Sequence, residues 1–115
     1  MYICRDYEKK TDDGGYFEAF IATLPEKVVR KIDYGLTLLR TQNRLSEKHI
    51  KHIGDGLFEL RTEFEGNIYR TFFIYDSGNV IVLFNGFQKK TQKTPRLEVL
   101  KAKKIMYSYY EKTRR

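Results

Sequence analysis

The sequence contains one cysteine, two prolines and no tryptophan. A single cysteine excludes an internal disulfide, and the cysteine and histidine residues show no spacing typical of a metal site. No apolar run reaches the length of a membrane span. The first ten residues, MYICRDYEKK, lack an apolar segment long enough for a signal peptide. We therefore expect a cytoplasmic protein with no cofactor, no bound metal and no place in a membrane.

Acidic residues are also in short supply, because 15 Asp and Glu accompany 22 Lys and Arg, which gives a formal net charge of +7. Such an excess is typical of a protein that meets a polyanion: nucleic acid, an acidic protein or an anionic membrane. The alternative is basic charge spread over the surface for solubility, although lysines concentrate at Lys89–Lys93 and Lys101–Lys104. The hydrophobic content of 41% and the length of 115 residues predict one folded domain over residues 1–115.

The clearest local pattern lies between residues 57 and 84. Apolar and polar residues alternate from Leu57 to Tyr75, which is the period of half-buried strands. Val80–Phe84 is continuously apolar, as a strand buried on both faces would be. Gly66-Asn67 matches a two-residue turn, so Leu57–Glu65 and Ile68–Tyr75 are predicted to form a hairpin.

This hairpin places two arginines on one face. In the first of two possible registers Glu63 lies opposite Arg70; in the second, with the loop at Glu65-Gly66, Arg61 lies directly opposite Arg70. The arginines share a face in both registers because side chains alternate along a strand. Like charges side by side destabilise a sheet, so the pair requires an anion. Either the acidic neighbours Glu59 and Glu63 or a ligand phosphate can supply it.

The opposite face of the hairpin is the predicted core side, which leaves the arginines on the open side. Its apolar residues are Phe58, Leu60, Phe64, Tyr69 and Phe73. Helical apolar stripes occur at 17–24, at 25–39 and from Pro95 to about Lys112, and Met1–Tyr7 alternates like a short strand. Thr41–Gly56 is predicted to be a connector. The order β-αα-βββ-α predicts an α+β domain with a small antiparallel sheet, an N-terminal αα-hairpin, a C-terminal helix, and helices mostly on one face.

Three phrases of this sequence, GLFELR, IYRTFFIY and IVLFNGFQKKTQKTP, are followed by a lysine-rich helix that contains AKK. They resemble the HigB-like, phage-derived branch of the RelE/ParE toxin superfamily, over about Leu24 to Tyr110. The resemblance implies a microbial RNase fold with a curved sheet. It also implies the toxin of a type II toxin-antitoxin system, which inhibits translation by cleaving mRNA on the ribosome without a metal. A cognate antitoxin, a helix-turn-helix protein of the HigA type, would neutralise it.

The resemblance also implies which residues carry the chemistry. The catalytic candidates are Arg61, Arg70, Lys89 and Lys90. The arginines would hold the phosphate, and a lysine would stabilise the transition state or act as a base. The candidates for RNA contacts are Lys51, His52, Phe87, Thr91, Gln92 and Lys93. Among these, His52 is a candidate proton carrier because of its residue type, and Phe87 can stack a base. The KKTQKTP loop contains no Tyr or His, so the identity of the acid and the base stays open.

Two other classes of function use the same basic face. The chain could be a non-catalytic RNA- or ribosome-binding module, or an interaction protein that receives an acidic partner. A purely structural explanation also exists, in which Arg70 and Glu63 form a cross-strand ion pair and the lysine loop is simply solvated.

Overall fold

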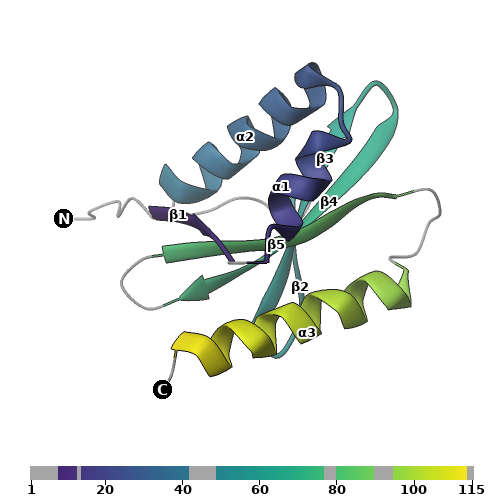
Figure 1. Cartoon of the computed structure of the whole chain (residues 1–115). Helices are drawn as coiled ribbons and strands as arrows, with labels where there is room; N and C mark the ends of the chain where they lie inside the picture. Colours follow the sequence, from purple (N-terminus) through teal and green to yellow (C-terminus); the bar gives the residue numbers. More distant parts are fainter. Residues whose placement is uncertain (1–7, 13, 42–48, 77–79, 90–94, 114–115) are drawn as a thin grey trace.

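The computed structural model describes residues 8–12, 14–41, 49–76, 80–89 and 95–113. Within these residues it contains five strands and three helices (Figure 1). In chain order they are β1 Glu8–Thr11, α1 Tyr16–Ala22, α2 Glu26–Thr41, β2 Ile50–Gly54, β3 Leu57–Phe64, β4 Asn67–Asp76, β5 Val80–Lys89 and α3 Arg96–Thr113. The predicted α+β class is confirmed, as are the paired helices near the N-terminus and the helix after Pro95.

Two parts of the predicted order differ from the structure. The segment predicted to be a connector contains β2, which pairs antiparallel with β3. Its sequence, IKHIG, does not alternate cleanly, so pairing with the edge of β3 rather than its own pattern makes it a strand. The predicted strand Met1–Tyr7 lies outside the described residues. The first described strand, β1, is polar (EKKT) and runs parallel to β5, so the sheet is mixed and not antiparallel throughout.

The strands are arranged in the order β1-β5-β4-β3-β2. The two central partners, β4 and β5, are apolar on both faces over much of their length. Ile81 and Leu83 of β5 point to one face, whereas Val82 and Phe84 point to the other, and all four are fully buried. The prediction of a strand buried on both faces is thereby confirmed.

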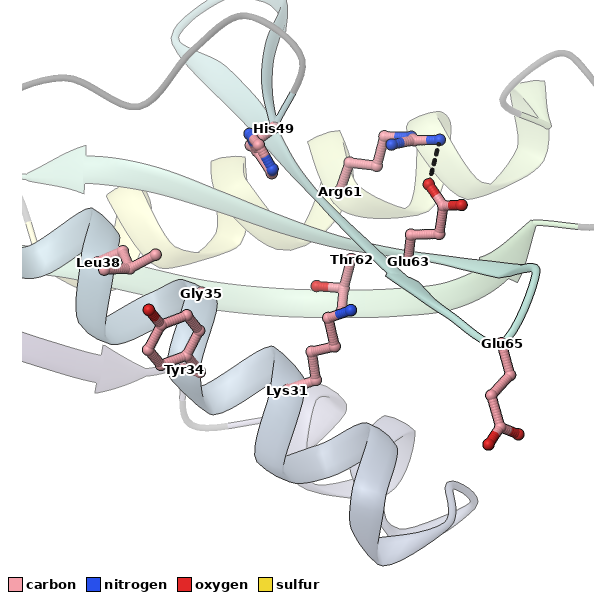
Figure 2. A pocket seen from close by; sticks show the side chains of 9 residues that line it. All are labelled: Lys31, Tyr34, Gly35, Leu38, His49, Arg61, Thr62, Glu63 and Glu65. Atoms are coloured by element: carbon pink, nitrogen blue, oxygen red, sulfur yellow. Dashed lines mark ion pairs between the residues drawn. The ribbon is translucent and has the colours of Figure 1, made fainter.

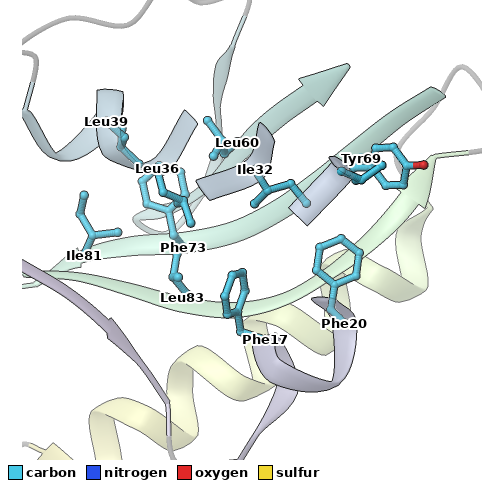
Figure 3. Packing of buried hydrophobic residues seen from close by; sticks show 11 residues of the cluster. Phe17, Phe20, Ile32, Leu36, Leu39, Leu60, Tyr69, Phe73, Ile81 and Leu83 are labelled. Carbon is cyan, nitrogen blue, oxygen red and sulfur yellow. The ribbon is translucent and has the colours of Figure 1, made fainter. Parts of the chain in front are cut away.

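Helices consequently cover both faces of the sheet. Figure 3 shows the first layer, in which α1 and α2 pack on β3, β4 and β5 through Phe17, Phe20, Ile32, Leu36, Leu39, Leu60, Tyr69, Phe73, Ile81 and Leu83. The second layer joins α3 to the other face through Leu57, Phe72, Ile74, Val82, Phe84, Phe87, Ala102, Ile105, Met106 and Tyr109. The expectation that helices lie mostly on one face is wrong, because the apolar residues on the second face also require cover.

The turn between β3 and β4 sets the register of the hairpin. Glu65 and Gly66 form its loop with φ of 49° and 80°, so both loop residues adopt the positive φ of a type I′ turn. Phe64 therefore lies opposite Asn67, and Arg61 lies opposite Arg70. Of the two registers considered from the sequence, the one with Glu65-Gly66 as the loop is correct. The twist of a type I′ turn matches the twist of the strands that it joins.

A β-bulge in β5 shifts its pairing with β4 and so sets the position of the last residues of β5. Thr71 lies opposite Gly86 and Phe73 lies opposite Leu83, so β5 has one residue more than β4 over this stretch. A Cβ atom at Gly86 would lie 2.7 Å from the backbone oxygen of Arg70 and would also overlap the ring of Phe20. Glycine thus lets β5 approach both β4 and α1.

Candidate functional site

The hairpin brings Arg61 and Arg70 into direct opposition. The N–H of Arg61 donates to the carbonyl oxygen of His49 at 2.7 Å, so its backbone faces β2 and not β4. Arg61 and Arg70 therefore form a non-hydrogen-bonded pair, the arrangement in which facing side chains lie closest. Two permanently charged guanidinium groups at this spacing repel each other unless anions accompany them.

Each arginine has its own carboxylate. Arg70 Nη1 lies 2.9 Å from Glu59 Oε1, and the Glu59 side chain is fully buried while that of Arg70 is 11% exposed. Arg61 Nη2 lies 3.1 Å from Glu63 Oε2, and these two side chains are more exposed, at 21% and 55%. The cross-strand Arg70–Glu63 pair considered from the sequence is wrong, because Glu63 lies opposite Ile68 in the observed register.

Two lysines on the neighbouring strands complete a group that we name the basic cluster: Lys51, Glu59, Arg61, Arg70 and Lys89. Lys51 lies directly opposite Glu59 in the β2–β3 pairing. Burial lowers the pKa of Lys89 below its usual value, and the nearby Arg70 guanidinium lowers it further. The Glu59 carboxylate opposes this shift, whereas Lys51 and Arg61 add smaller lowering contributions. The strand pairings place these side chains on one face of the sheet: Lys51 lies opposite Glu59, Arg61 lies opposite Arg70, and Lys89 comes two residues after Phe87, which lies opposite Arg70.

The basic cluster lies on the same face of the sheet as α3. Glu59 and Arg61 alternate in phase with Leu57, and Arg70 alternates in phase with Phe72, which both pack in the core beneath α3. The other face of the hairpin packs against α1 and α2, which confirms the predicted core side. The face predicted to be open is therefore only partly open: α3 covers one part, and the basic cluster remains partly accessible on the other.

The remaining sequence candidates lie in different surroundings. Phe87 lies opposite Arg70 but is buried, with its ring stacked on Phe72 at 5.8 Å between centroids. A nucleobase cannot reach this ring without displacing core side chains. His52 lies on the other face of the sheet, 4.9 Å from the ring of Phe58, so the structure does not bring it to the basic cluster. Lys90, Thr91, Gln92 and Lys93 lie outside the described residues.

Sequence reasoning missed a groove of about 390 Å³ beside the basic cluster (Figure 2). It is lined by Lys31, Tyr34, Gly35, Leu38, His49, Arg61, Thr62, Glu63 and Glu65, and Arg61 belongs to both sites. The signal that could have indicated it is Tyr34, an aromatic residue on the polar side of α2 whose surface is 63% exposed. Its position beside β3 depends on helix packing, which the sequence pattern does not give.

The described part of the chain offers neither a cluster of metal ligands nor a membrane-spanning helix. No three His, Cys, Asp or Glu side chains gather there in the way that a metal ion would require. No helix in the same residues is both long and apolar enough to cross a membrane.

The chemistry available to the basic cluster is that of anion binding. Guanidinium groups donate several hydrogen bonds in a fixed plane and match the oxygens of a phosphate. The Nε–H of Arg70 is buried and has no acceptor among the described residues, so the ion pair with Glu59 leaves it donor capacity. Because its pKa is lowered, a larger fraction of Lys89 is present as the neutral amine at a given pH than for an ordinary lysine.

Comparison with known proteins places this chain in a protein family. No curated protein sequence matches the chain significantly. A family model with the description "Phage derived protein Gp49-like (DUF891)" matches residues 19–107, which include α2, all of β2–β5 and most of α3. This family is of the RelE/HigB-like toxin type. The chain therefore belongs to the Gp49-like family of phage-derived, toxin-like proteins.

Proposed function

We propose that this protein is the toxin of a type II toxin-antitoxin system, of the HigB-like branch, and that it cleaves mRNA on the ribosome. The observation that carries the proposal is the direct opposition of Arg61 and Arg70 beside Lys89. Neither the core nor the turn requires two facing arginines, and a phosphate provides the anion that suits them. Membership in a toxin-like family supports the same conclusion.

Metal-free RNA cleavage begins with attack of the ribose 2′-OH on the adjacent phosphorus. The O–P bond to the next nucleotide then breaks, which leaves a 2′,3′-cyclic phosphate and a 5′-OH. Arg61 and Arg70 would stabilise the charge that develops on the phosphorane oxygens. Lys89 would accept the 2′-OH proton as its neutral amine, because its lowered pKa makes that form available. The leaving 5′ oxygen would take its proton from solvent water.

The direct test is induced expression followed by mapping of transcript ends. The wild-type protein is expected to arrest growth and to cut transcripts within translated regions. A transcript without a start codon, which ribosomes do not translate, should stay intact. Arg30→Ala is a matched control, since Arg30 pairs with Glu26 on the exposed side of α2, away from the basic cluster. Growth arrest without cut transcripts would refute the nuclease.

One observation favours a second function, a non-catalytic RNA- or ribosome-binding module. The Arg70 side chain is 11% exposed and already paired with Glu59, which is what a structural ion pair would show. Such a module would inhibit translation while leaving every transcript intact. Transcript mapping therefore separates the two functions in the same experiment.

The proposed partner is a cytoplasmic antitoxin, a small helix-turn-helix protein of the HigA type. It would silence the toxin by covering the basic cluster or by blocking its entry into the ribosome. Addition of the partner should stop cleavage in both cases. A partner that binds while cleavage on translating ribosomes continues would refute both.

A further inference from the structure

The groove beside the basic cluster lies between α2 and the outer edge of β3. In Figure 2, Tyr34 and Lys31 extend from α2 on one side of β3, and Arg61 and Glu63 extend on the other. Arg61 lines the groove and also belongs to the basic cluster, so the two sites adjoin at the edge of β3. Its volume of about 390 Å³ is within the range of small-molecule sites.

Among the residues that the structure describes, the edge of β3 carries backbone groups without a partner at this groove. The N–H of Arg61 points outward to His49, the last described residue opposite β3 in that direction. Backbone direction repeats every second residue, so the N–H and C=O of Glu63 point to the same edge. Neither group has a hydrogen-bond partner among the described residues. A donor and an acceptor thus lie side by side at the edge of the groove.

The side chains of the groove select a flat and uncharged occupant. Tyr34 presents an exposed ring, and Gly35 and Leu38 add apolar surface. The formal charges of Lys31 and Arg61 cancel those of Glu63 and Glu65, so the lining as a whole does not favour a charged occupant within the groove. Arg61 and Arg70 favour a phosphate at its end. An occupant that is aromatic, carries hydrogen-bonding groups on its edge and is linked to a phosphate satisfies each of these features.

We propose that this groove binds a nucleobase of the RNA, next to the phosphate held by Arg61 and Arg70. The base stacks on Tyr34, and its edge forms hydrogen bonds with the backbone N–H and C=O of Glu63. Stacking on an aromatic side chain accommodates every base, because each has a π face. The proposal rests on the proposed function, since it takes RNA as the ligand of the basic cluster.

The test measures binding separately from cleavage. The probe is a short single-stranded oligonucleotide of 2′-O-methyl ribonucleotides, which has no free 2′-OH and cannot be cut, and one of its nucleotides carries the fluorescent base 2-aminopurine. Stacking on Tyr34 is expected to quench this fluorescence in the wild-type protein. Tyr34→Ala should abolish the quenching and weaken binding by about 5- to 100-fold, the loss typical of removing one stacking side chain. Tyr34→Phe should retain both, because it keeps the ring.

Tyr107→Ala serves as the matched control, since Tyr107 is 51% exposed on α3 and does not line the groove. The proposal is overturned if Tyr34→Ala binds the probe as tightly as the wild type, or if the wild type fails to bind it at millimolar concentration. Unchanged RNA affinity with loss of antitoxin binding in Tyr34→Ala would assign the groove to a protein partner instead. Tyr34-dependent binding by a protein that never cuts RNA would support the groove and refute the nuclease.

Discussion

At the scale of single residues, the central feature is the ion pair between the buried glutamate Glu59 and Arg70. Glu59 is fully buried and forms an ion pair with Arg70 at 2.9 Å. Removal of one member of a buried ion pair leaves the other charge uncompensated and typically costs about 3–5 kcal/mol of stability. A loss of toxicity in Arg70→Ala alone would therefore not distinguish catalysis from folding.

We predict that the double variant Glu59→Gln/Arg70→Gln folds but does not cleave. Both charges are removed together, so the buried site remains neutral, and the two amides can pair with each other. Cleavage should fall by about 10²–10³, the effect typical of losing one preorganised donor to the transition state. Thermal unfolding and single-turnover cleavage would be measured on the same preparation. Cleavage at the wild-type rate by a folded double variant contradicts the role given to Arg70.

We predict that Lys89→Arg is inactive although it keeps the positive charge. Arginine does not lose its proton in proteins, so it cannot accept the 2′-OH proton. For the wild type, the cleavage rate should rise about tenfold per pH unit up to the pKa of Lys89, which lies below the value of ~10.4 for a free lysine.

Lys51→Ala tests the same assignment by moving this pH profile. Because the charge of Lys51 lowers the pKa of Lys89, its removal should shift the rising limb to higher pH. An active Lys89→Arg protein would show that Lys89 acts only through its charge.

At the scale of elements, close approach of backbones decides where glycine is required. A Cβ at Gly86 would meet Phe20 and the backbone oxygen of Arg70, whereas a Cβ at Gly35 would lie 3.6 Å from Leu60, an ordinary contact. We predict that Gly86→Ala lowers stability by about 1–3 kcal/mol through overpacking. Gly35→Ala, in the middle of α2, should be neutral or stabilising by up to ~1 kcal/mol because alanine favours the helix. Denaturant unfolding of both variants checks the contrast, and equal stability of the two would contradict it.

The elements also show what the sequence could and could not predict. The long periodic segments, α2, β3, β4, β5 and α3, follow from their own patterns. The strand β2 does not, because Lys51 and His52 are exposed and its pairing with β3 defines it. The ion pair of Arg70 with Glu63 that was considered from the sequence is wrong for a related reason. The ion-pair partners depend on the register, which the φ angles of Glu65 and Gly66 decide and the sequence left open.

The part of the candidate site that is formed by residues close together in the sequence could be predicted, whereas the part that depends on a residue far away in the sequence could not. Arg61 and Arg70 are joined by a short hairpin, so their shared face followed from alternation alone. Tyr34 lies more than 20 residues earlier in the chain and reaches the site through the packing of α2. No periodicity in the sequence carries that information.

At the scale of the whole molecule, the net charge of +7 influences the rate at which charged partners associate with the protein. We predict that an antitoxin segment covering the basic cluster is rich in Asp and Glu, and that its association rate falls as salt increases. Stopped-flow measurements between low and high ionic strength, with Lys51→Glu as a charge-reversed variant, would show this. A rate independent of salt would indicate that the partner instead packs on α1 and α2 and blocks access to the ribosome.

The position of α3 on the second face has a consequence for the order of synthesis. Every residue of the basic cluster precedes α3 in the chain, yet Leu57, Phe72 and Phe84 beside the cluster are buried by α3. While a ribosome is still adding α3, these side chains have no cover and the floor of the site is unfinished. A nascent chain of this protein would thus complete its site only after the ribosome has passed the codons for α3.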